Sequence, residues 1–260
     1  MKDVTYSEYL GLDKVLNAQF PRSEGEHDEM LFIIIHQVFE LWFKQLLHEM
    51  TLLTKSLEKG DSFQATATLG RCLTILKTMV SQIDILETMT PVSFNSFRDR
   101  LTSSSGFQSA QFRQFEFLLG IKRKEMIAIH EKDPAAVKLL TDTFNSPSFC
   151  DYFYKYLVAK GYQVPKALLE RDVTEPATSC PELHPILIKI YREDPLTRQI
   201  CELLVDMDEG IQEWRYRHVK MVERTIGNKT GTGGSSGVEF LKRSLFKPVF
   251  SDLWEIRSEL

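Results

Sequence analysis

Two histidines occupy positions where a helical pattern calls for an apolar side chain. His36 follows Phe32 by one helical turn, and His218 follows Trp214 by one turn, in two long segments whose apolar residues recur every three or four positions. Burying an imidazole costs free energy unless its nitrogens find partners. A hydrogen-bonded core histidine is one interpretation of each position. A pair of such histidines in one helical chain favours a second interpretation, in which a metal or a ligand supplies the partner.

Among metal-containing groups, haem fits this pattern better than zinc. Haem accepts a single protein ligand and occupies an apolar cavity between helices. Glu49 follows His48, but no second histidine completes the His-Glu-x-x-His spacing of a zinc protease. The remaining histidines lie in polar surroundings, and we expect them at the surface; they are His27, His48, His130 and His184.

A glycine-rich segment from Gly231 to Gly237 follows the helix that carries His218. It is not a phosphate-binding loop, because no Gly-Lys-Ser/Thr ends it and no strand precedes it. Its composition is typical of a flexible linker. The alternative is a loop that closes over a ligand in the neighbouring cavity, with its hydroxyl and amide groups as donors.

Several arginines offer recognition of an anion. Arg98 follows Phe94 by four residues, so the two share a face if this segment is helical. A guanidinium holds a carboxylate through two parallel hydrogen bonds, although a solvated surface cation is the alternative. The same two interpretations, surface cations or partners of haem propionates, apply to a group in the last long helix: Arg215, Arg217, Lys220 and Arg224.

Hydrophobic periodicity predicts helices that position these residues, and no stretch of alternating β-branched residues competes. Cap residues and prolines mark their ends. We therefore expect an all-α helical bundle in a single domain spanning residues 1–260. The expected elements are a helix over 28–59, a second from Asp61 or Ser62 to Thr90-Pro91, a third after the polar stretch 102–106, helix starts at Asp133-Pro134 and Ser146-Pro147, an irregular segment over 162–185, and a long helix from Asp194-Pro195 to Gly227.

Composition excludes several classes of protein. The 260 residues are 43% apolar and 26% charged, and the net charge of −4 gives no electrostatic basis for binding nucleic acid or an anionic membrane. The longest purely apolar run, Met30–Ile35, is far shorter than the roughly 18 residues of a membrane span. No apolar leader is visible at the N-terminus, and the four cysteines form no Cys-x-x-Cys pair. We therefore expect a cytoplasmic protein with free thiols.

Longer motifs resemble a known family. The matching segments are His36–Gln45 (HQVFELWFKQ), Ser105–Ser109 (SGFQS), His218 together with Gly231–Gly237, and, near the start, Tyr6–Leu10 and Leu12–Lys14. In this order they resemble the tryptophan 2,3-dioxygenases, and the resemblance covers essentially the whole chain. It implies an all-α homotetramer with a b-type haem, Fe(II) in the active form. Such an enzyme inserts both atoms of O2 across the indole C2–C3 bond of L-tryptophan and forms N-formyl-L-kynurenine, the first step of tryptophan catabolism by the kynurenine pathway.

The resemblance also implies roles for individual residues. His218 looks like the proximal iron ligand and His36 like the residue that hydrogen-bonds the indole N–H. The remaining implied roles are Phe32, Ile33, Ile34, Ile35 and Phe94 in the substrate pocket, Arg98 on the substrate carboxylate, Thr232 on its ammonium and carboxylate, Ser105 and Gly106 near the haem, and Tyr6, Tyr9 and Leu10 in a neighbouring subunit's pocket. The segment 1–27 is accordingly expected to pack on a neighbour. Phe94 stands where some members of the family have a tyrosine.

Other functions remain open at this stage. One is a haem monooxygenase of the same superfamily that acts on a simpler indole and has little use for Arg98 and Thr232. Another is a non-catalytic haem protein that senses a gas. A third is a helical scaffold in which both histidines are ordinary core residues. For the enzyme, we favour His36 as a group that orients the substrate over His36 as a base.

Overall fold

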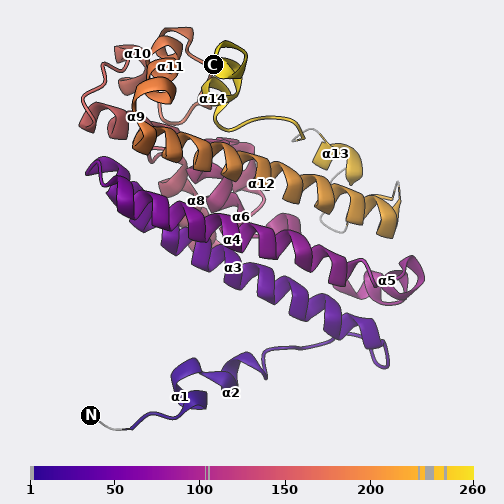
Figure 1. The fold of residues 1–260 in the computed structure, drawn as a ribbon. Coiled ribbons are helices and arrows are strands. Elements are labelled where there is room, and N and C mark those ends of the chain that lie inside the picture. Colours follow the sequence, from indigo (N-terminus) through magenta and orange to yellow (C-terminus); the bar gives the residue numbers. More distant parts are fainter. Residues whose placement is uncertain (1–2, 103, 105, 228, 232–236, 243–244) are drawn as a thin grey trace.

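The chain forms a bundle of helices, seen in a computed structural model that describes residues 3–102, 104, 106–227, 229–231, 237–242 and 245–260 (Figure 1). No strand occurs among these residues, in agreement with the all-α prediction. The α-helices are α1 Tyr6–Leu10, α2 Leu12–Val15, α3 His27–Glu58, α4 Ser62–Leu86, α5 Pro91–Arg98, α6 Ala110–Leu118, α7 Glu125–Ala128, α8 Pro134–Phe144, α9 Phe149–Ala159, α10 Lys166–Leu169, α11 His184–Glu193, α12 Pro195–Ile226, α13 Val238–Lys242 and α14 Ser251–Glu255. Short 3-10 turns cover Asp99–Leu101, Gly106–Gln108, Pro181–Leu183 and Ile256–Glu259.

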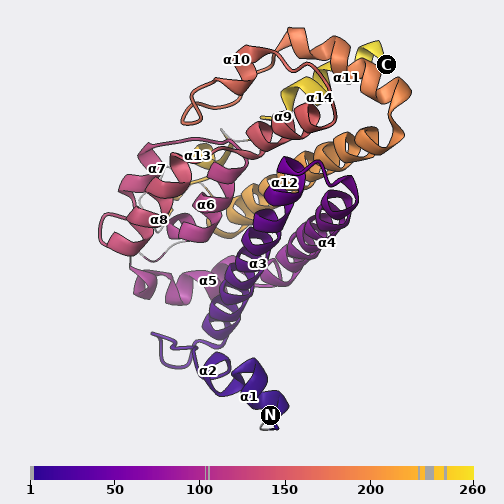
Figure 2. The same ribbon diagram turned by 90° about the vertical axis from the view of Figure 1, so that its left-hand side faces the viewer.

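Three long helices make the frame of the bundle, with α4 packed against both α3 and α12 (Figures 1 and 2). Their ends follow the predicted signals. The Asp61 side chain accepts a hydrogen bond from the backbone N–H of Gln64 at 3.1 Å, which caps α4. Asp194 caps α12 in the same way, and Gly227 ends that helix with a φ of 58°, a conformation that favours glycine.

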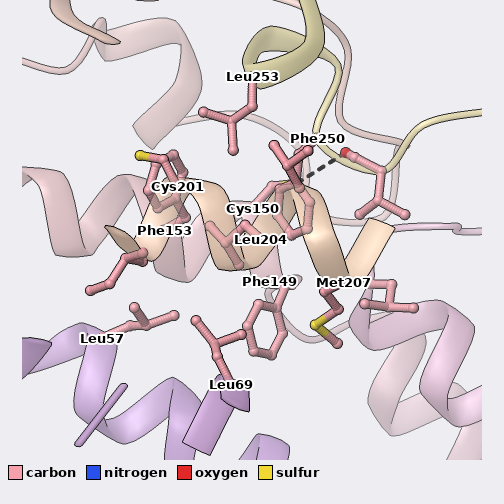
Figure 3. Close-up of a cluster of buried hydrophobic side chains, with 14 of the residues drawn as sticks. Leu57, Leu69, Phe149, Cys150, Phe153, Cys201, Leu204, Met207, Phe250 and Leu253 are labelled. Atoms are coloured by element: carbon pink, nitrogen blue, oxygen red, sulfur yellow. Dashed lines mark hydrogen bonds between the residues drawn. The ribbon is translucent and has the colours of Figure 1, made fainter. Parts of the chain in front are cut away.

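The main core lies at one end of the long helices, where α9 and the C-terminal segment cover them (Figure 3). Leu57, Leu69, Phe149 and Leu204 are each 0% exposed there. Burial of a large apolar side chain stabilises a fold by about 1.5–3 kcal/mol, so this cluster supplies much of the rigidity of the frame. The opposite end of α3, α4 and α12 carries a smaller apolar cluster and remains available for a cavity.

Buried carboxylates fix the segments that connect to this core. Asp208 of α12 accepts hydrogen bonds from the backbone N–H of Val249 at 2.8 Å and from Nε1 of Trp254 at 2.9 Å. These bonds tie the C-terminal segment to α12.

By length and composition α3 is apolar enough to cross a membrane, but it packs against α4, α6 and α9 in the bundle.

Three predicted boundaries were wrong. The second helix ends at Leu86 and not at Thr90-Pro91, which instead begins α5. The start of α9 is not Ser146-Pro147 but Ser148, because the Asp151 carboxylate accepts from both the backbone N–H and the hydroxyl of Ser148, at 2.6 and 2.7 Å. The segment 162–185 is not wholly irregular, since it contains α10 and the turn Pro181–Leu183 and runs into α11. Short helices of this kind have too few turns to show an apolar period.

Two of the four histidines expected at the surface lie elsewhere. His130 lies in the segment that joins α7 to α8 and is only 6% exposed. His184 is partly buried, and its Nε2 lies 3.0 Å from the Asp252 carboxylate. The Asp252 partner of His184 is distant in sequence, so local polarity was a poor guide for this residue. His27 and His48 are exposed, and the four cysteines are free thiols, as predicted.

The first two helices stand apart from the bundle (Figures 1 and 2). No residue of α1 or α2 is buried. Tyr6 is 76% exposed and Tyr9 is 81% exposed. Large aromatic side chains exposed to this extent on an ordered helix are unusual for a chain that functions alone.

Candidate active site

A deep cavity opens between α3, α4, α5, α6 and α12. It contains about 1640 Å³ of empty space, its open mouth included. Its wall is mostly aromatic and aliphatic, with a few polar groups among them. The candidate residues that line it are Phe32, His36, Phe94, Arg98, Gly106 and His218.

His36 projects from the middle of α3 into this cavity. Its Nδ1 lies 2.6 Å from the backbone carbonyl of Phe32. A carbonyl only accepts, so Nδ1 carries the proton and Nε2 is left as an acceptor. Burial lowers the pKa of His36, and the ring is therefore neutral at pH 7. Gly106 lies beside this nitrogen, because a Cβ added there would be 3.9 Å from Nε2. The neutral acceptor Nε2 thus has free space beside it, because Gly106 has no side chain.

His218 lines the same cavity from α12. Burial, with smaller contributions from His36 and Arg113, lowers its pKa to about 4. Within the described part of the chain it has no hydrogen-bond partner, although its ring stacks on Trp214 at an angle of 9°. A neutral, desolvated imidazole without a partner is costly unless an external group binds it. Neutral imidazole is also the form that ligates a metal.

Phe32, Phe94 and Arg98 form one side of the cavity. The Phe32 ring lies 4.2 Å from the ring of His36 and 5.7 Å from that of Phe94, measured between centroids. Arg98 sits at the end of α5, and its Nη2 donates to the backbone carbonyl of Thr230. Its Nε is buried and has no hydrogen-bond partner among the described residues. The apolar wall formed by the two phenylalanines therefore ends at the Arg98 guanidinium, whose Nε has no acceptor among the described residues.

An ion cluster that the sequence analysis did not identify forms another part of the wall. Glu116 of α6 is 2% exposed, and its carboxylate accepts from Arg113 at 2.5 Å, from Arg123 at 2.9 Å and from Arg215 at 3.1 Å. Burial opposes the charge on Glu116, but these guanidinium groups outweigh burial and hold its pKa below the ordinary value. The cluster retains two more positive than negative charges in the wall of the cavity.

Two buried donors in this part of the wall have no partner within the described residues. They are Nε of Arg113 and Nε1 of Trp214. The Arg113 guanidinium also lies 5.0 Å from the ring of Phe107 and 5.2 Å from that of Phe112. Buried donors of this kind normally have an acceptor. Together with the excess positive charge, they indicate a place for an anionic group.

The other candidate residues are distributed as follows. Ile33 and Ile34 do not line the cavity, and Ile35 packs into the adjoining apolar cluster. Tyr6, Tyr9 and Leu10 are exposed on α1, away from this chain's own cavity. Ser105 and Thr232 lie outside the described residues. Of the four cations on the last long helix, Arg215 is buried in the wall, Arg217 pairs with Asp84 and Glu87, and Lys220 and Arg224 are exposed.

This arrangement is suited to hold a large flat group and a smaller aromatic molecule together. His218 offers a metal ligand on one wall, and His36 offers an acceptor that shares its cavity. The unpartnered state of His218, the cationic cluster and the unpartnered indole and guanidinium donors all fit a haem with its carboxylates. We find no cluster of three or more His, Cys, Asp or Glu for a non-haem metal in the described chain.

Comparisons with known proteins agree with this chemistry. The sequence profile of the tryptophan 2,3-dioxygenase family matches residues 1–147 and 170–260. The chain is 53% identical over 258 residues to the tryptophan 2,3-dioxygenase of Herpetosiphon aurantiacus, covering 99% of this chain and 98% of that protein. It is 49% identical to that of Anaeromyxobacter dehalogenans, covering 99% and 96%, and 43% identical to that of Caulobacter vibrioides, covering 100% and 99%.

Proposed function

The chain belongs to the tryptophan 2,3-dioxygenase family, and from this premise we propose how its cavity performs the reaction. The protein is a haem-dependent oxidoreductase that cleaves the indole C2–C3 bond of L-tryptophan with O2, giving N-formyl-L-kynurenine. One observation carries the assignment of the site. His218 on α12, which has no hydrogen-bond partner among the described residues, and the neutral His36 on α3 line the same apolar cavity.

We propose that the cofactor is a b-type haem in the ferrous state, held by His218. The buried donors Nε of Arg113 and Nε1 of Trp214 would hold its carboxylates. When bound, the haem supplies the redox chemistry by which O2 reacts. The protein contributes a dry cavity, which excludes water from the reacting groups.

His36 orients the substrate. Its Nε2 is the free acceptor of the ring, and it accepts a hydrogen bond from the indole N–H. The ring of Phe32 lies beside that of His36 and gives the indole an apolar surface, while Gly106 leaves room beside the acceptor. Positioning of this kind lowers the barrier by fixing the reacting atoms in one geometry. No proton transfer to His36 is needed for this role.

Arg98 recognises the amino-acid end of the substrate. Its Nε, which has no partner among the described residues, is available to donate to the carboxylate. Phe94 adds packing but no hydroxyl, so Arg98 carries this recognition with less help than in relatives with a tyrosine. The family resemblance assigns the ammonium and carboxylate also to Thr232, which lies outside the described residues. A simple indole gains nothing from these groups, which favours tryptophan over a smaller indole as the substrate.

We propose that the enzyme is a cytoplasmic homotetramer in which segment 1–27 completes a neighbouring pocket. The exposed Tyr6, Tyr9 and Leu10 support this arrangement, since they lie on helices that extend away from their own bundle (Figure 2). Four free cysteines fit a reducing compartment. No contact with nucleic acid or membrane is needed for the reaction.

Product analysis tests the proposed function. Reduced, haem-loaded protein should convert L-tryptophan to a product with two added oxygen atoms when O2 is admitted. A monooxygenase would add one oxygen, preferably to an indole without the amino-acid group. A gas sensor would show a Soret band without loss of tryptophan, and a scaffold would show no Soret band even after incubation with haem.

A further inference from the structure

Glu116 connects three segments that border the cavity. Arg113 lies one turn earlier on α6, Arg123 lies in the segment that precedes α7, and Arg215 lies on α12. Residues of both α6 and α12 line the cavity, and the bond from Arg215 to Glu116 joins the two helices directly. The carboxylate therefore fixes the position of each guanidinium relative to the others.

The bonding of Arg113 shows what Glu116 leaves free. Its Nη1 is taken up by Glu116, and its Nε is buried without a partner among the described residues. The side chain is held between Phe107 and Phe112. Because Glu116 fixes one edge of the guanidinium, the orientation of its remaining N–H donors is fixed as well. A buried arginine so restrained loses little conformational entropy when an anion binds.

We infer that Glu116 is a positioning residue for the carboxylate-binding end of the cofactor site: it holds Arg113 and Arg215 where they meet a haem propionate. This inference rests on the proposed haem site. A carboxylate repels another carboxylate, so Glu116 opposes a propionate by charge alone. Any favourable contribution of Glu116 to haem binding must then come from the positions in which it holds the two arginines, and not from its charge.

The first test uses wild-type apoprotein and two forms of the cofactor. Haem and haem dimethyl ester share the macrocycle and the iron, but the ester has no carboxylates. A charge-assisted hydrogen bond contributes about 1.5–3 kcal/mol, so we expect the ester to bind at least about tenfold more weakly. Equal affinities would overturn the inference while leaving haem binding intact. Failure of the wild type to bind either form would instead contradict the proposed function.

The second test uses Glu116→Asp. This change keeps the negative charge but shortens the side chain by one methylene, which moves the carboxylate away from the guanidinium groups. We expect the ratio of ester to haem dissociation constants to fall at least threefold, because Arg113 and Arg215 lose their fixed positions. An unchanged ratio would show that position is not what matters. Glu116→Gln extends the test: a ratio that rises in this variant would identify Glu116 as an opposing charge only. The ratio cancels any general damage to the cavity, since both cofactor forms experience it.

Glu49→Gln is the matched control. Glu49 is 3% exposed and is paired with Arg71, but it does not line the cavity. We expect its ester-to-haem ratio to equal that of the wild type.

The carboxylate that the cluster binds could also belong to the substrate, and the Michaelis constant for tryptophan distinguishes this alternative. If Glu116→Asp raises this constant and leaves the cofactor ratio unchanged, the cluster binds the substrate and the inference is wrong.

Discussion

The imidazole of His218 lies almost parallel to the indole of Trp214, with 5.3 Å between ring centroids and an angle of 9° between planes. The two residues are one turn apart on α12. Stacking of this kind fixes the plane of His218, which no hydrogen bond within the described chain does. The helix thus presents a neutral nitrogen in a defined orientation to the cavity.

Replacement of His218 by Ala removes the proposed iron ligand. Loss of a hydrogen-bond partner of a metal ligand costs about 10–100-fold in affinity, so loss of the ligand itself should weaken haem binding by at least that factor. Haem titration followed at the Soret band measures this. His130→Ala is the matched control, since His130 is buried but does not line the cavity. A normal histidine-ligated spectrum in His218→Ala would contradict the assignment.

The acid limb of the activity profile reports on His36. Because burial lowers its pKa below the ordinary value of 6.5, the ring is neutral at pH 7 and takes up a proton only in more acid solution. We expect kcat/KM to stay level as the pH falls to 6.5 and to decline below it, as Nε2 ceases to be an acceptor. Measurement between pH 5 and 8 tests this, and a decline centred above pH 6.5 would contradict it.

His36→Ala separates orientation from base catalysis. Loss of one neutral hydrogen bond costs about 0.5–1.5 kcal/mol, so kcat/KM for tryptophan should fall by no more than about tenfold. 1-Methyltryptophan has no indole N–H and should be insensitive to the change. A loss in the range of about 10²–10⁴-fold would instead indicate a general base.

Arg98→Ala removes the proposed contact to the substrate carboxylate. We expect the Michaelis constant for tryptophan to rise about 10–100-fold, as for a lost hydrogen bond to a charged group, with haem affinity unchanged. Arg100→Ala is the control, because Arg100 is exposed two residues later and does not line the cavity. An unaltered Michaelis constant in Arg98→Ala would refute this role.

Mixed oligomers test whether the N-terminal helices act on a neighbour. Subunits with Tyr6→Ala and Tyr9→Ala keep Arg98, and subunits with Arg98→Ala keep both tyrosines. If the arm acts in trans, reassembled mixtures contain complete pockets and recover activity that neither variant has alone. If each arm served its own chain, mixing would restore nothing.

Local chemistry made most of the fold predictable. Asp61, Asp194 and Gly227 mark helix ends through bonds to residues close in sequence, and the structure confirms each. The error at Ser146 arose because two Ser-containing starts lie two residues apart. Only the two hydrogen bonds that Ser148 donates to the Asp151 carboxylate distinguish them.

The site was only partly predictable, for a physical reason. His36 and His218 stand out because each interrupts an apolar stripe. Glu116 interrupts one as well, four residues after Phe112, but charged residues on short helices are usually exposed, so it was overlooked. Its partners Arg123 and Arg215 come from other segments, and only the fold brings them together. For Arg215 the sequence accordingly allows both a surface position and a position in the cavity wall.

The destination of the oxygen atoms tests the central claim most directly. Reduced, haem-loaded enzyme is mixed with L-tryptophan under ¹⁸O2, and the product is analysed at once by mass spectrometry. The account predicts N-formylkynurenine that carries both labelled atoms. A product with a single labelled atom, or tryptophan recovered unchanged beside an intact Soret band, would contradict it.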